Sequence, residues 1–190
     1  MDDPKETLRR SIRLKEYDYS QPGAYFVTIC THRRECLLGK FGEGKIHLST
    51  AGLAVQSIWE KLPQRYCHTG IDIYRVMPNH FHGIIVIEPV GVTRDGATLR
   101  SSSSGGKRPN GPIPDSLGAM IGQFKSRSTK RIWALPEVDR RPIWQRNYYD
   151  HIIRDEQEFQ NIWDYIDTNP QRWLEDQLQP TAEAHLFEQD

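Results

Sequence analysis

His80 and His82 stand one residue apart at the head of the apolar stretch 83–87. Alternate side chains of a β-strand point to the same face, so in a strand the two imidazoles lie together and Phe81 points the other way. Two neutral imidazoles can bind one divalent metal ion if a third ligand comes from elsewhere and open positions remain for substrate. A pair of partly exposed strand histidines without a metal fits the same pattern.

Tyr165 and Asn169 supply the missing chemistry from the other end of the chain. They are four residues apart in a predicted helix, 155–169, and therefore share one helix face. The amide oxygen of Asn169 suits a hard ion such as Mg²⁺ or Mn²⁺ that bridges to phosphate oxygens. A phenol with a pKa of ~10 is a weak nucleophile, so Tyr165 needs a metal-polarised phosphate or a nearby base. The alternative is a half-buried helix tyrosine and a helix-terminal asparagine before Pro170.

The elements that must position these residues follow from the hydrophobic pattern. Strands are predicted where β-branched and aromatic residues cluster or alternate, and helices where apolar residues recur every three or four positions. The order β-α-β-β-α-β with one further helix predicts an α+β, ferredoxin-like sandwich, whose four-stranded antiparallel sheet is followed by the helix that carries the tyrosine. The predicted strands are 24–31, 71–77, 80–88 and 143–153, and the predicted helices are about 50–66, 116–133 and 155–169.

The composition predicts one domain with additions. Hydrophobic residues make up 37% of the 190, and the mean hydropathy is −0.68. We expect a basic N-terminal arm at 1–22, a folded domain at 23–173 interrupted by a flexible Gly-, Ser- and Pro-rich insertion at about 89–112, and an acidic tail at 174–190. No apolar run approaches the ~20 residues of a membrane span, and the first residues lack the apolar core of a signal peptide. The expected location is cytoplasmic.

Charge is distributed unevenly along the chain. Residues 155–190 hold ten acidic side chains and one arginine, whereas the whole chain is neutral, so the part before them is basic. Basic residues interleaved with aromatic ones can bind a polyanion such as DNA, although solvated helix faces have a similar composition. Trp144 fits the core better. The candidate DNA-binding residues are Arg9, Arg10, Arg13, Lys125, Arg127, Lys130, Arg131, Arg146, Tyr148 and Tyr149.

Three ordered motifs carry a resemblance to a known family. They are Val-Met-Pro-Asn-His-Phe-His-Gly at 76–83, Ile-Trp-Gln-Arg-Asn-Tyr-Tyr-Asp-His-Ile-Ile-Arg at 143–154 and Asp-Tyr-Ile-Asp-Thr-Asn-Pro at 164–170. Together they resemble the single-tyrosine HUH transposases, most closely the REP-associated tyrosine transposases, which are related to insertion-sequence transposases. The resemblance covers roughly residues 10 to 173 and makes residues 23–173 the HUH nuclease domain.

The resemblance implies roles for four residues. His80 and His82 would be metal ligands, Tyr165 the nucleophile, and Asn169 the third metal-binding side chain, where insertion-sequence relatives have glutamine. Tyr148 and Tyr149 are alternative nucleophiles by position but lack a ligand four residues on. His151 has no assigned role.

The resemblance also implies an activity and partners. A Mg²⁺- or Mn²⁺-dependent enzyme would nick and rejoin single-stranded DNA beside hairpins of repeated palindromes, through a 5′-phosphotyrosine intermediate. Its partners would be single-stranded and hairpin DNA, which implies association with the nucleoid, and both a homodimer and a monomer remain open. Two alternatives are a protein that binds hairpins without cutting them and a metal-dependent phosphoesterase that uses water.

Overall fold

The computed structural model describes residues 17–89, 113–175 and 178. Arg9, Arg10 and Arg13, nearly all of the insertion and most of the acidic tail lie outside these residues. Within the described ranges, no helix is long and apolar enough to cross a membrane.

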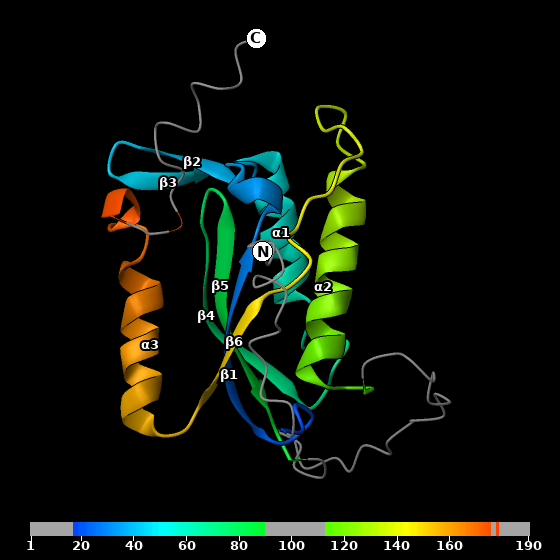
Figure 1. The fold of residues 1–190 in the computed structure, drawn as a ribbon, viewed down its shortest axis with the longest axis vertical. Helices are drawn as coiled ribbons and strands as arrows, with labels where there is room; N and C mark the ends of the chain where they lie inside the picture. The colour runs from blue at the N-terminus through cyan, green and yellow to red at the C-terminus, as the bar shows by residue number, and fades with distance from the viewer. Residues whose placement is uncertain (1–16, 90–112, 176–177, 179–190) are drawn as a thin grey trace, which may run out of the picture.

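A four-stranded antiparallel sheet forms the centre of the structure (Figure 1). The strands β1 (Gly23–Cys30), β4 (Thr69–Val76), β5 (His80–Ile87) and β6 (Tyr149–Ile153) lie in the order β4-β5-β1-β6. This is the order of a β-α-β-β-α-β unit whose first and third strands are central. The predicted α+β sandwich is confirmed.

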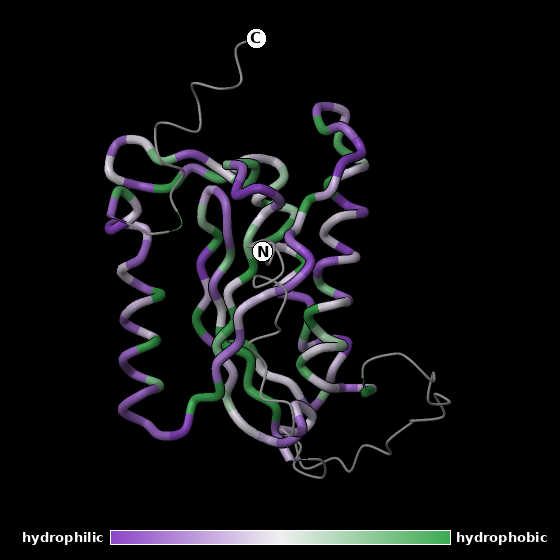
Figure 2. The backbone as a smooth tube through the Cα atoms, viewed as in Figure 1, coloured by the Kyte–Doolittle hydropathy of each residue, from purple (hydrophilic) through white to green (hydrophobic). Residues whose placement is uncertain are grey.

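Helices cover both faces of this sheet. The helices α1 (Thr50–Glu60) and α2 (Leu117–Ile132) pack on one face, and α3 (Glu156–Thr168) packs on the other (Figure 1). Each begins at a side-chain cap, because Ser49, Ser116 and Asp155 accept hydrogen bonds from backbone N–H groups three residues on. Hydrophobic residues of α3 face the sheet and polar ones face outward (Figure 2). The extra helix is therefore held against the sheet by an apolar stripe.

Two apolar clusters hold the layers together. The larger lies between the sheet and the helices α1 and α2, and the smaller, around Phe26, Ile84 and Ile166, lies beneath α3. Gly83, the residue after His82, permits close packing in the larger cluster, since a Cβ there would lie 2.6 Å from Cζ2 of Trp59. The histidine strand is thus fixed closely against α1.

The structure corrects two predicted boundaries and adds a hairpin. The first helix ends at Glu60 instead of 66, because Pro63 lacks the N–H that would continue it. The fourth strand begins at Tyr149 instead of 143; Trp144 makes only an isolated bridge to Thr31. The region 39–48, where no strand was predicted, forms a hairpin of β2 (Gly39–Gly42) and β3 (Lys45–Leu48). Glu43 and Gly44, both at positive φ, make its two-residue turn.

Two short 3-10 helices, His32–Arg34 and Trp173–Glu175, complete the described elements. Trp173 is buried, whereas Leu174 is exposed. At the other end, Tyr17 and Tyr19 pack against Tyr25 of β1. Residues 17–22, expected in a polar arm, therefore include side chains that join the main core.

Candidate metal and nucleophile site

Strand pairing places a row of four side chains on the α3 face of the sheet. Arg75 of β4 pairs with His82 of β5, His82 pairs with Thr28 of β1, and Thr28 pairs with Tyr149 of β6. Directly paired residues point to the same face of a sheet, and His80 lies two residues before His82. The predicted geometry of the histidine pair is present, with ring centroids 4.5 Å apart.

Two contacts orient the His82 ring. Its Nδ1 is hydrogen-bonded to Oγ1 of Thr28 at 2.8 Å, and the Phe26 ring stacks against it at a centroid distance of 5.5 Å. If Nδ1 carries the proton and donates it to Thr28, the lone pair of Nε2 faces the space beneath α3. That is the tautomer which a metal requires.

A second polar residue fixes the tautomer of His80. The Nδ2 group of Asn79 donates to the carbonyl oxygens of Arg34 (3.1 Å) and Leu178 (2.6 Å), so Oδ1 of Asn79 is the atom that faces Nδ1 of His80, at 2.8 Å. Oδ1 can only accept, so Nδ1 of His80 donates and Nε2 holds the lone pair. Burial, aided by the positive charge of Arg34, lowers the pKa of His80 to about 3. The imidazole is therefore neutral at physiological pH.

Tyr165 of α3 reaches this pair. Its Oη lies 3.4 Å from Nε2 of His82, and the two rings are 5.3 Å apart. The Phe26 ring also meets the tyrosine ring edge-on at 6.1 Å. The side chain is 40% exposed, whereas His80 and His82 are at most 1% exposed. The phenol thus stands at the boundary between the buried imidazoles and solvent.

Asn169 ends α3 one turn beyond Tyr165 and is 3% exposed. Its Oδ1 is buried and has no hydrogen-bond partner among the residues that the structure describes. A buried carbonyl oxygen without a partner costs ~1–3 kcal/mol, and coordination of a cation would offset that cost. Imidazole nitrogens and an amide oxygen are donors that suit a divalent ion with positions left open for phosphate oxygens. The chemistry of the three side chains therefore fits the metal ion that the sequence predicts.

No group of three His, Cys, Asp or Glu side chains that could hold a metal occurs within 17–89 and 113–175.

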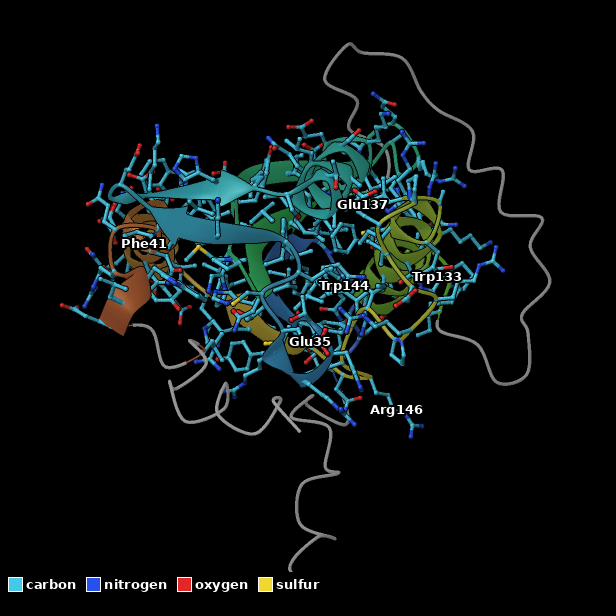
Figure 3. The ribbon with its side chains drawn as sticks, turned by 90° about the horizontal axis from the view of Figure 1, so that it is seen from above. Glu35, Phe41, Trp133, Glu137, Trp144 and Arg146 are labelled. Atoms are coloured by element: carbon cyan, nitrogen blue, oxygen red, sulfur yellow. The ribbon has the colours of Figure 1, made fainter. Side chains whose placement is uncertain are left out.

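Most of the predicted DNA-binding residues lie away from this site. Lys125, Arg127, Lys130 and Arg131 belong to α2, in the layer on the opposite face of the sheet (Figure 1). Arg146 points outward from the loop before β6, whereas Trp144 lies inside the molecule (Figure 3). Trp144 is 8% exposed and donates from Nε1 to Oγ of Ser128, which confirms it as a core residue.

Lys125 and Tyr148 have structural contacts that the sequence did not indicate. Nζ of Lys125 donates to the carbonyl oxygens of Gln145, Arg146 and Asn147, and burial lowers the pKa of Lys125 to about 8. Tyr148 packs against the larger core. The lysine thus tethers the loop that leads into β6 and is not free to lie along a phosphate backbone.

Of the two tyrosines among the predicted DNA-binding residues, Tyr149 lies on the same face of the sheet as His82. It is 42% exposed and its ring lies 6.2 Å from that of Phe26, at the edge of the sheet. Next to it, Nε2 of His151 is 2.7 Å from Oε1 of Glu158, which joins β6 to the first turn of α3. His151, which had no predicted role, therefore anchors the start of the helix that carries Tyr165.

Sequence reasoning missed Thr28, Asn79, Arg75 and Asp167 as residues of this site. Thr28 and Asn79 orient the imidazoles, and Arg75 donates from Nη2 to Oδ1 of Asp167, which lies between Tyr165 and Asn169 on α3. Asn79 was visible in the motif beside His80, but the partners of His82 depend on strand register, which no local pattern reveals.

The fold occurs in a solved structure of a known protein. A REP-associated tyrosine transposase bound to a REP hairpin has the same fold, with a TM-score of 0.54 at 19% sequence identity over 84% of this chain and 73% of that one. The fold that the motifs predicted by their resemblance to the tyrosine transposases is thus confirmed.

A protein of Haemophilus influenzae, itself uncharacterized, is 40% identical over 172 residues, which span 90% of this chain and 92% of that protein. The chain belongs to the same family as this Haemophilus influenzae protein. No model of a protein family matches the sequence.

Proposed function

We propose that the protein is a metal-dependent tyrosine transposase that nicks and rejoins single-stranded DNA beside a hairpin. The observation that carries the proposal is the contact of Tyr165 of α3 with His82 of β5, whose ring lies beside that of His80. One turn further along α3, Asn169 has a buried Oδ1 without a hydrogen-bond partner among the described residues. The solved structure with the same fold is a transposase bound to a REP hairpin, which supports hairpin DNA as the substrate class.

Nε2 of His80, Nε2 of His82 and Oδ1 of Asn169 would hold the ion, Mg²⁺ or Mn²⁺. When bound, it would polarise the scissile phosphate and offset the negative charge that develops in the transition state. Thr28 and Asn79 hydrogen-bond Nδ1 of His82 and of His80, and so orient both rings in the site. The protein's own contribution is therefore a pair of oriented imidazoles.

Tyr165 performs the covalent step. Its phenolic oxygen forms a bond to phosphorus, the bond from phosphorus to the 3′ oxygen breaks, the phenol loses its proton to solvent and the departing 3′ oxygen gains one. The products are a 5′-phosphotyrosine and a free 3′-hydroxyl. Because the phosphotyrosine conserves a phosphodiester bond, a 3′-hydroxyl can reverse the step on the same or another strand without ATP.

The test is to incubate the protein with hairpin oligonucleotides that carry single-stranded flanks, with Mn²⁺, Mg²⁺ or EDTA. A covalent protein–DNA adduct is expected with either metal and not with EDTA. Tyr165→Phe should form no adduct, while Tyr149→Phe, which removes a neighbouring phenol, should form it. An adduct that persists in Tyr165→Phe would reject this nucleophile. Tight hairpin binding without any adduct in the wild type would instead indicate a DNA-binding protein that does not cut.

A further inference from the structure

Arg75 occupies a position in the site that the proposed chemistry does not yet use. It lies on the edge strand β4 directly opposite His82, and its Nη2 is 2.5 Å from Oδ1 of Asp167. Asp167 stands midway between Tyr165 and Asn169 on α3. The guanidinium is thus held beside both the histidine strand and the helix of the nucleophile.

The ion pair is open to solvent, since the side chains of Arg75 and Asp167 are 38% and 42% exposed. Exposed ion pairs stabilise a fold by only ~0–1 kcal/mol, so Nη2 can exchange this partner at little cost while Nη1 donates to the carbonyl oxygen of Tyr74. A phosphodiester is a suitable new partner, because a guanidinium donates charge-assisted hydrogen bonds to phosphate oxygens.

A cavity of about 480 Å³ that is widely open to solvent adjoins Arg75. It lies between the hairpin strand β3, the edge strand β4 and Pro170, the residue that follows Asn169. This volume falls within the ~300–1,000 Å³ of small-ligand pockets, which is enough for a nucleotide. The lining includes two cations and apolar side chains against which a base can pack, among them Lys45, Ile46, Leu48, Ile73 and Arg75.

The shape of β4 disfavours a peptide strand as the occupant. Its pairing with β5 shifts between Ile71 and Tyr74, and the Asp72 carboxylate, which also lines the cavity, accepts a hydrogen bond from the backbone N–H of Ile73. An irregular edge with a charged residue resists the addition of another strand. The cations and the nearby site favour a nucleic acid strand instead.

We propose that Arg75 binds a phosphate of the single strand next to the scissile one, in exchange for Asp167, and that the adjoining nucleotide occupies the cavity. This inference rests on the proposed function, because it extends the substrate that the site acts on. Asp167 competes with the DNA for the same guanidinium. Removal of the arginine and removal of the aspartate should therefore change DNA binding in opposite directions, whereas a simple structural clamp would make the two losses equivalent.

The experiment measures binding in the Tyr165→Phe protein with Mg²⁺, so that no cleavage is needed. Two probes are used: a hairpin oligonucleotide with an unpaired flank and the same hairpin without it. Arg75→Gln should weaken binding of the flanked hairpin about tenfold, as expected for loss of a charge-assisted hydrogen bond, and should leave the blunt hairpin unchanged. For the flanked hairpin, the slope of log K against log salt concentration should be shallower by about 0.7 in Arg75→Gln than in the parent protein, which is the value for one phosphate contact on a single strand.

Asp167→Asn should strengthen binding of the flanked hairpin several-fold. Arg141→Gln is the matched control, since Arg141 also pairs with a carboxylate, that of Glu35, but does not line the cavity; it should change neither affinity. Lys45→Gln, an exposed change on β3, should weaken binding of the flanked hairpin and leave binding of the blunt hairpin unchanged.

The inference would be overturned if both Arg75→Gln and Asp167→Asn lowered the affinity for the flanked hairpin, or if Arg75→Gln lowered the affinity for both probes equally. Arg75 would then be a clamp for α3. Unchanged affinity of Arg75→Gln for the flanked hairpin would also overturn it. The proposed function fails separately, if the wild type forms no adduct while the flank-dependent effects are present.

Discussion

The Thr28 hydroxyl lies 2.8 Å from Nδ1 of His82, and the two residues face each other on paired strands. This bond sets which nitrogen of the imidazole is free for a metal. Replacement of Thr28 by Val retains the shape but removes the acceptor. Loss of such an outer partner commonly weakens metal binding ~10–100-fold, so we expect a rise of that size in the Kd for Mn²⁺, measured by isothermal titration calorimetry. Thr50→Val, on the opposite helical layer, should bind Mn²⁺ like the wild type.

Asn169 gives a prediction about metal-dependent stability. Mn²⁺ should raise the Tm of the wild type, because it binds only the folded state. Asn169→Ala should lose most of this rise and, in EDTA, should unfold at a temperature no lower than the wild type, since the change also removes a buried Oδ1 that has no hydrogen bond with any described residue. Asn161→Ala, an exposed change on the same helix, should keep the full rise. A normal Mn²⁺ response in Asn169→Ala would remove this residue from the ligand set.

The buried imidazole of His80 predicts a pH dependence of folding in EDTA. Burial lowers its pKa from 6.5 to about 3 in the folded state, so between these values the unfolded chain binds a proton that the folded chain does not. Stability should be complete above pH 6.5 and should fall as the pH decreases towards 3, with a slope of up to ~1.4 kcal/mol per pH unit from this group. Urea unfolding from pH 7 to pH 4 should show a smaller loss in His80→Gln. Parallel curves for the two proteins would contradict the burial effect.

Replacement of Lys125 should destabilise the fold, whereas replacement of an exposed lysine on α2 should not. The ammonium of Lys125 donates to three backbone carbonyls before β6, so Lys125→Met should lower the free energy of unfolding by ~1–3 kcal/mol. Lys130→Met, an exposed change, should stay within ~0.5 kcal/mol of the wild type. Chemical denaturation checks both values, and equal small effects would show that the tether contributes little.

The histidine strand, the helix of the nucleophile and the sandwich were predictable because each depends on a local pattern. The alternation around His80 and the stripe of α3 fix which face each residue occupies. The i, i+4 spacing then brings Tyr165 and Asn169 to the same side. The order of strands and helices along the chain limited the sheet to few arrangements. The observed arrangement brings β5 and α3 into contact.

The residues that were missed depend on longer-range structure. The basic pattern of α2 resembles a phosphate-binding face, but Lys125 is occupied by a loop twenty residues further along the chain. Nothing in the sequence around Arg75 distinguishes it from other strand residues. Its place beside the site results from the pairing of β4 with β5 and from its ion pair with α3. Register and helix docking are set by the packing of the whole core, so a local sequence window does not contain them.

The contrast in exposure across the site has a kinetic consequence. His80, His82 and Asn169 are nearly sealed, whereas Tyr165 opens to solvent. Under the proposed function, a cation and a DNA strand would both enter from the solvent side of Tyr165, and a strand seated over the phenol would close the route of the cation. We therefore expect the cation to bind first, and a chelator added to the complex to remove it only as fast as the DNA departs.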